Sequence, residues 1–293
     1  MSALMRAQLR ATLPHADLRP VQNAVAPATL AHNAGHVALT HIGVRFGQGA
    51  RAVDAVQDVS LHIAPGEFVS IVGPSGCGKS TLLNVIAGFT PASTGQALLD
   101  GRAIGGPGPE RGVVFQQYSL FPWLTVQGNV EYGLRVRGLP RQQRHAIAED
   151  WLARCGLADF AQHYPEQLSG GMRQRVGIVR ALANEPRVLL LDEPFGALDA
   201  QTRLVMQEIL LDIWQRFRIS VLFITHDIEE AVFLSDRVYV MTARPGRIKA
   251  ELPIALPRPR HHDMASHGEG LALVRTLKDL IRHESLQAFA MQS

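Results

Sequence analysis

The amino-acid sequence predicts an α/β fold with a mostly parallel central sheet, and three patterns carry this prediction. Residues 188–191 and 221–224 are apolar at consecutive positions, as in strands that are buried on both faces. Between them lies a segment with apolar residues at helical spacing, and strand, helix, strand is the unit of a parallel sheet. A glycine-rich loop, residues 73–81, follows another apolar run and precedes a helical segment. The helix between the two strands is predicted to bury one face with Leu204, Ile209, Ile213, Trp214 and Phe217.

The first 35 residues are predicted to be a disordered extension. They are rich in Ala, Leu, Pro, His and Arg, they contain Asp17 as their only acid, and they have no clear periodicity. A targeting sequence is the first alternative, but the segment lacks a continuous apolar stretch and a convincing cleavage site. An arm that folds on binding and a start codon assigned too far upstream are the others.

The remaining elements follow in chain order. Strands are predicted at residues 37–39, 59–63 and 68–72, a helix at 79–87, and a strand at 113–115. Between about 117 and 182 helical patterns replace strand patterns, which indicates a helical insertion in the α/β domain. After Met241, a turn at 243–247 and a proline-rich spacer at 252–260 precede a helix at about 271–283. The predicted organisation is an extension at 1–35, one domain at 36–250, and a spacer with a C-terminal helix at 251–293.

Composition excludes several classes of protein. The 293 residues contain no stretch near the roughly 18 to 20 uninterrupted apolar residues of a membrane-spanning helix, so another chain would have to cross any membrane. The formal net charge is only +3 and the basic residues are scattered, which does not indicate nucleic-acid binding. The two cysteines, Cys77 and Cys155, argue against a disulfide framework and favour a reducing cytoplasm.

The glycine-rich loop matches the G-x-x-x-x-G-K-[ST] pattern of triphosphate-binding loops. Its backbone N–H groups and the helix that follows would hold phosphate oxygens. Lys79 is expected to reach the β- and γ-phosphates, and the Ser80 hydroxyl to bind Mg²⁺. The alternative, a chance surface turn, is disfavoured by the flanking strand and helix. The loop consists of Gly73, Pro74, Ser75, Gly76, Cys77, Gly78, Lys79, Ser80 and Thr81.

Two acidic residues end the apolar run at 188–191. A carboxylate at the end of such a strand can hold Mg²⁺ through water, which is the role expected of Asp192. The adjacent Glu193 projects differently, and we hypothesise that it is the general base that activates a water. The alternative is a purely structural acidic pair.

A rarer string, Leu-Ser-Gly-Gly-Met-Arg-Gln at 168–174, identifies a narrower class. Together with the acidic pair and a histidine after the run at 223–225, it resembles the signature of the nucleotide-binding subunit of an ABC transporter. The resemblance covers roughly residues 37–250. It implies a P-loop NTPase (RecA-like) core, an N-terminal antiparallel β subdomain and an inserted α-helical subdomain at about 117–182.

The same resemblance implies roles for four further residues. Gln116 matches the glutamine that contacts the metal and the attacking water, with Gln117 as an alternative one residue later. His226 matches the switch histidine that hydrogen-bonds the γ-phosphate, and Asp199 lies in a segment like the family's D-loop. Phe46 matches the aromatic platform for adenine, although it could be an ordinary core or edge-strand phenylalanine.

The signature turn opens a helix and would make a second anion site from Ser169, Gly170 and Gly171. One chain has no evident use for two triphosphate sites. The resemblance implies that the signature of one subunit closes on ATP held by the phosphate loop of the other. It therefore implies a head-to-tail dimer of two copies of the chain that encloses two nucleotides.

Four segments, at 106–116, 120–123, 225–231 and 244–247, resemble the nitrate, sulfonate and taurine group of ABC importers. That resemblance implies transmembrane permease subunits as partners, a separate substrate-binding protein as an indirect one, and a peripheral position on the cytoplasmic face of the bacterial inner membrane. The predicted permease groove contains Phe121, Pro122, Trp123 and Leu124, whose alternative role is to pack the helical subdomain.

Other functions stay open at this point. The chain could be a soluble ABC ATPase of DNA or translation, although the interval between phosphate loop and signature is too short for a long coiled coil and only one cassette is present. It could also serve an importer of an unrelated solute, or be one half of an exporter. The pair His261 and His262 is predicted to lie in a solvated tail instead of forming a metal site.

Overall fold

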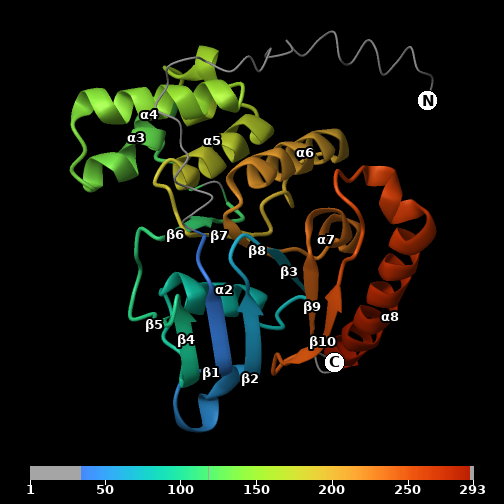
Figure 1. The fold of residues 1–293 in the computed structure, drawn as a ribbon. Helices are drawn as coiled ribbons and strands as arrows, with labels where there is room; N and C mark the ends of the chain where they lie inside the picture. Colours follow the sequence, from blue (N-terminus) through green and yellow to red (C-terminus); the bar gives the residue numbers. More distant parts are fainter. Residues whose placement is uncertain (1–33, 118, 291–293) are drawn as a thin grey trace.

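The structure, a computed structural model, describes residues 34–117 and 119–290, which form two sheets covered by helices (Figure 1). The larger sheet has the strand order β10-β9-β3-β8-β7-β6, and the smaller one has the order β2-β1-β4-β5. The prediction of an α/β fold is confirmed. Residues 1–33 of the predicted extension lie outside the described residues.

The larger sheet is parallel except at one edge. Strands β6, β7, β8, β3 and β9 run parallel to their neighbours, and β10 runs antiparallel to β9. Because parallel strands end at the same edge of a sheet, the loops that follow β3, β6, β7 and β8 meet there. The strands are β3 (Phe68–Val72), β6 (Arg111–Val114), β7 (Val188–Asp192), β8 (Ser220–Ile224), β9 (Arg237–Met241) and β10 (Ile248–Pro253).

The smaller sheet is antiparallel and longer than predicted. Its strands are β1 (Val37–Phe46), β2 (Val53–Ile63), β4 (Thr94–Leu99) and β5 (Arg102–Ala103). The pairing of β1 with β2 has three register shifts, the first between Leu39 and Ile42. These irregularities break the alternation of apolar and polar residues, which explains why the pattern predicted only short pieces of both strands.

Helices α3, α4 and α5 gather on one side of the molecule, and α8 lies alongside α7 and β10 on another (Figure 1). The helix behind the glycine-rich loop has the predicted bounds. The α-helices are α2 (Lys79–Ala87), α3 (Val126–Val136), α4 (Arg141–Arg154), α5 (Gly170–Leu182), α6 (Ala200–Phe217), α7 (Ile228–Leu234) and α8 (Gly268–Ala290). Short 3₁₀ helices in the described part of the chain are η1 (Gly49–Arg51), η2 (Ala158–Phe160), η3 (Pro165–Gln167) and η4 (His262–Ser266).

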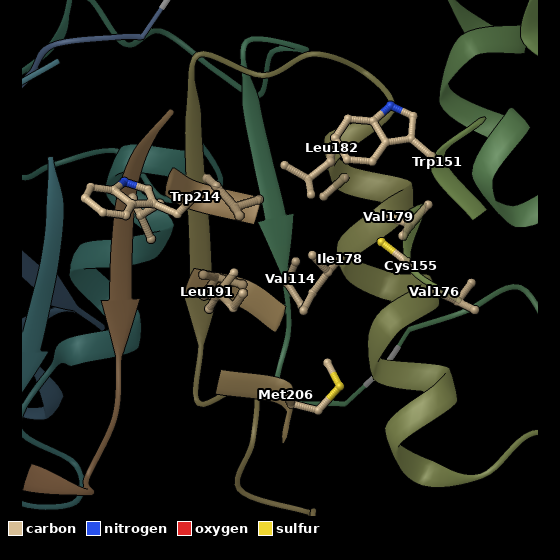
Figure 2. Packing of buried hydrophobic residues seen from close by; sticks show 14 of the residues in the cluster. Val114, Trp151, Cys155, Val176, Ile178, Val179, Leu182, Leu191, Met206 and Trp214 are labelled. Atoms are coloured by element: carbon tan, nitrogen blue, oxygen red, sulfur yellow. The ribbon is translucent and has the colours of Figure 1, made fainter. Parts of the chain in front are cut away.

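The central strands bury side chains on both faces. Leu189 and Leu191 of β7 enter a core shared with α3, α4, α5 and α6, part of which is drawn in Figure 2. Val188 and Leu190 enter the opposite core, shared with α2 and the smaller sheet. One predicted core position is wrong: Leu204 of α6 is 45% exposed, because it precedes the part of the helix that packs on the sheet.

The segment between β10 and α8 is packed against the protein. Arg260 is buried and donates to the main-chain oxygens of Val232, Phe233 and Ser235 around the end of α7. His261 is exposed, as predicted, but His262 stacks on Phe233 with ring centroids 4.0 Å apart. The prediction of a solvated tail is therefore wrong for His262, because the chain folds back over α7.

Candidate functional site: a nucleotide pocket at the ends of the parallel strands

The glycine-rich loop joins β3 to α2 and wraps around the lysine side chain. Lys79 Nζ donates to the main-chain oxygens of Gly73 and Pro74, both at 2.9 Å, and the side chain is only 6% exposed. Gly78 has φ of 100°, and a Cβ there would lie 2.8 Å from Ala55 O of β2. The loop therefore needs glycine at this position, because a side chain would be strained and would strike the neighbouring backbone.

A hollow of about 540 Å³ opens over this loop. Its walls come from the end of β1, β2, the phosphate loop, α2 and the loops after β6, β7 and β9. Lys79 and Arg244 are the cations among the described residues that line it, and Glu193 is the anion. The described residues that line it are Phe46, Val53, Ala55, Ser75, Gly76, Gly78, Lys79, Ser80, Thr81, Gln116, Glu193 and Arg244.

A hydroxyl that lines this hollow meets a carboxylate just outside the described lining. Ser80 Oγ donates to Asp192 Oδ1 at 3.1 Å, although the residues are far apart in sequence. Burial raises the pKa of Asp192, and the hydrogen bond from Ser80 partly offsets that effect. Hydroxyl and carboxylate oxygens are ligands that Mg²⁺ prefers, so the donor set fits this ion.

The second acidic residue pairs with the predicted switch histidine. His226 lies in the loop that follows β8, and its Nδ1 is 3.1 Å from Glu193 Oε2. Glu193 has φ of 43°, a left-handed conformation that is uncommon for a residue with a side chain. Its main-chain N–H donates to Ile224 O at 3.0 Å, which ties the turn after β7 to the end of β8.

Two more predicted residues contribute to the walls of the hollow. Gln116 lines it, whereas Gln117 is not among its described lining residues, which favours Gln116 of the two candidates. Phe46 lines it at the end of β1 and is 48% exposed, so it is not a core phenylalanine. An exposed ring at the rim of a polar pocket is available to stack on a flat ligand.

The signature turn lies elsewhere. Ser169 caps α5, with its Oγ accepting from Met172 N at 3.3 Å, and none of the described residues that line the hollow belongs to the signature. A Cβ on Gly171 would lie 2.6 Å from Thr202 of α6, so the turn packs closely on that helix. Asp199 caps α6 by accepting from Gln201 N at 3.1 Å.

Two residues near the site, Glu230 and Arg244, were not predicted to have a role there. Glu230 is buried at the start of α7, where Gln207 Nε2 donates to its Oε1 at 2.7 Å and the Thr225 hydroxyl donates to its Oε2. It thereby braces the residue that precedes His226. Arg244 lines the hollow from the turn after β9. In the sequence its arginine-proline-glycine turn carries a family resemblance, but no local pattern indicates that the arginine lines a pocket.

Comparisons with known proteins agree with this geometry. Residues 56–196 match the family model described as ABC transporter. The chain is 52% identical to the nitrate import ATP-binding protein NrtD of Synechocystis sp. (76% of this chain, 84% of the relative). It is 56% identical to the taurine import ATP-binding protein TauB of Yersinia pestis (68% and 78%). The dimeric structure of a post-hydrolysis state of an ATP-binding cassette bound to ADP and Pi matches with a TM-score of 0.67 and 34% identity (75% and 100%).

These matches define the class of protein. The chain belongs to the ATP-binding proteins of the ABC transporter family, and it is an ABC-type ATPase. Within that family it is similar to the subunits named for nitrate and taurine import. None of the helices in the described part of the chain is long and apolar enough to span a membrane.

Proposed function

We propose that this chain binds and hydrolyses ATP to energise an importer of a small anion such as nitrate, sulfonate or taurine. The single observation that carries the catalytic part is the hollow that joins the phosphate loop to Gln116 and Glu193. The import part rests on the similarity to NrtD and TauB, which are named for nitrate and taurine import.

The phosphate loop supplies the binding of ATP. Lys79 would leave the carbonyls of Gly73 and Pro74 for the β- and γ-phosphates, exchanging neutral acceptors for charged ones. The main-chain N–H groups of the loop and the N-terminus of α2 would hold further phosphate oxygens. Phe46, exposed at the rim, would stack on adenine.

Ser80, Asp192 and Gln116 would hold Mg²⁺. The bond of 3.1 Å between Ser80 and Asp192 brings two oxygen donors together, and Gln116 lines the same hollow. When bound, this ion neutralises phosphate charge that builds up during hydrolysis. The raised pKa of Asp192, caused first by burial, is consistent with a carboxylate that gains from a nearby cation.

Glu193 would act as the general base and His226 as the γ-phosphate contact. Glu193 Oε2 lies 3.1 Å from His226 Nδ1, so the imidazole orients the carboxylate. Its position in the hollow leaves it free to accept a proton from a water aligned with the γ-phosphate. The left-handed backbone at Glu193 directs its side chain differently from that of Asp192.

Two copies of the chain would complete each site. The signature residues Ser169, Gly170 and Gly171 lie outside the hollow in one chain, yet they open a helix and can bind an anion. A second copy in head-to-tail orientation would bring its signature onto the bound ATP, with Asp199 in the interface. The similar cassette is described as dimeric.

A transmembrane permease would be the partner on the helical side. Trp123 is 71% exposed, and its ring lies 5.6 Å from that of Phe121, which is half-buried. Exposed aromatic side chains of this kind mark protein interfaces. The chain would then sit on the cytoplasmic face of the inner membrane, and a separate substrate-binding protein would select the anion.

A pull-down from native membranes in mild detergent, with mass spectrometry of the bound proteins, tests this proposal. A polytopic permease should bind the parent chain and be lost with Trp123→Ala. The matched control is Val136→Ala, which removes another side chain that is 71% exposed, on α3. Recovery of only ribosomal, DNA-associated or no partners, while a control transporter stays intact, would contradict the proposal and favour a soluble ABC ATPase.

A further inference from the structure

The turn between β9 and β10 packs directly against the phosphate loop. Gly246 N donates to Ala55 O at 3.0 Å and Gly246 O accepts from Gln57 N at 2.9 Å, which joins the turn to β2. A Cβ on Gly246 would lie 2.0 Å from Cys77 O in the phosphate loop. This close approach fixes the position of the turn relative to the phosphate loop.

Arg244 extends from this turn into the nucleotide hollow. Its Nη2 donates to Gly76 O of the phosphate loop at 3.2 Å, and the side chain is exposed to the hollow that Lys79 also lines. A guanidinium has five N–H donors, so one bond to a carbonyl leaves others for phosphate oxygens. Its delocalised charge suits phosphate recognition.

The C-terminal helix α8 holds this turn from behind. Glu284 is 4% exposed, and its Oε2 accepts from Ala243 N, next to Arg244, at 2.9 Å. Its Oε1 accepts from Lys249 Nζ of β10 at 2.6 Å. Burial raises the pKa of Glu284, but the hydrogen bonds from Lys249 and Ala243 outweigh that effect and lower it, so the carboxylate stays ionised.

We propose that Arg244 is a nucleotide-binding residue whose guanidinium contacts the triphosphate of ATP, and that Glu284 positions it by anchoring the turn to α8. This inference rests on the ATP site proposed above. It gives the C-terminal helix a role in nucleotide affinity, through the chain of contacts from Glu284 to Ala243, Arg244 and Gly76.

The test measures the affinity for AMP-PNP, a non-hydrolysable ATP analogue, by calorimetry with the full chain. Loss of a charge-assisted hydrogen bond at a partly exposed site should weaken binding about tenfold in Arg244→Ala. Arg244→Lys should recover part of the affinity, and the salt dependence of binding should be smaller in Arg244→Ala than in the parent. Arg247→Ala, at an exposed residue of the same turn outside the described lining, is the matched control and should bind like the parent.

A double-mutant cycle tests the positioning role of Glu284. Glu284→Gln should weaken binding several-fold. The double variant should bind no more weakly than Arg244→Ala alone, because both changes act on the same contact between Arg244 and the triphosphate. Circular dichroism checks that each variant is folded. Normal affinity in folded Arg244→Ala, or an equal loss in Arg247→Ala, would overturn the contact, and additive losses would overturn the positioning. If the parent itself does not bind AMP-PNP, the ATP site proposed above fails instead.

Discussion

The surroundings of Glu230 predict how the free energy of unfolding depends on pH. Its carboxyl is 6% exposed at the start of α7, and burial raises its pKa to about 7. Hydrogen bonds from Thr225 and Gln207 act in the opposite direction. Of the charged groups near it, Asp227 raises the pKa and Arg203 lowers it. The folded chain therefore holds a proton on Glu230 at pH values where the unfolded chain has lost it.

The sign of the effect follows from proton linkage. Between the ordinary carboxyl pKa of 4.5 and the folded value of about 7, the folded chain binds more protons than the unfolded chain. The contribution of Glu230 to the free energy of unfolding is therefore fully present below pH 4.5 and is lost as the pH rises through 7. The loss amounts to about 3 kcal/mol, because one pKa unit corresponds to about 1.4 kcal/mol.

The assay compares the parent with Glu230→Gln by urea unfolding at several pH values between 5 and 8. The difference in the free energy of unfolding should change in favour of the variant by about 2.5 kcal/mol over this range, most of the full loss, because the amide has no charge to bury. Glu229→Gln, at the exposed neighbouring position, controls for the loss of one negative charge from α7. A pH-independent difference between the parent and Glu230→Gln would refute the reasoning.

Three further predictions concern the nucleotide pocket. Glu193→Gln should reduce ATP turnover at least a hundredfold and leave binding of AMP-PNP intact, because only the base is lost. Cys77, 1% exposed and with its pKa raised by burial, should react slowly with iodoacetamide at pH 7; once alkylated it should block ATP binding, and prior ATP should protect it. Gly246→Ala should lower the free energy of unfolding by about 1–3 kcal/mol in urea titrations, since the new methyl group meets Cys77 O.

Each of these has a clear contrary result. Retained hydrolysis in Glu193→Gln would remove Glu193 as the base. Rapid alkylation of Cys77, or alkylation that leaves ATP affinity unchanged, would contradict its placement within the phosphate loop. Unchanged unfolding of Gly246→Ala would mean that the turn can move away from the loop at little cost.

The parts of the fold that could be predicted are those with a strong local pattern. Strand β7 was evident from consecutive apolar residues, and the bounds of α2 matched because the phosphate loop fixes where the helix begins. The meeting of Ser80 with Asp192 also follows from the sequence, since parallel strands end at one edge of the sheet. Both residues belong to sequence motifs at the ends of parallel strands, so the sheet itself brings them together.

The remainder depends on tertiary contacts without a local pattern. Leu204 fits helical spacing, but spacing does not state which turn of α6 faces solvent. Arg244 enters the pocket only because Gly246 can approach Cys77, and nothing near Arg244 in the sequence indicates that contact. The burial of Glu230 likewise depends on Gln207, a residue of another helix.

The two cores on opposite faces of β7 and β8 have a consequence for how the protein unfolds. Strands β7 and β8 form a partition between them, with Leu191 and Phe223 on one side and Leu190 and Leu222 on the other. Unfolding of the elements around either core would expose apolar side chains of β7 and β8 to water. It would also remove packing that holds these strands in place for the other core. The elements that pack on the two faces of β7 and β8 should therefore unfold as one cooperative unit, although their apolar side chains are divided between separate interiors.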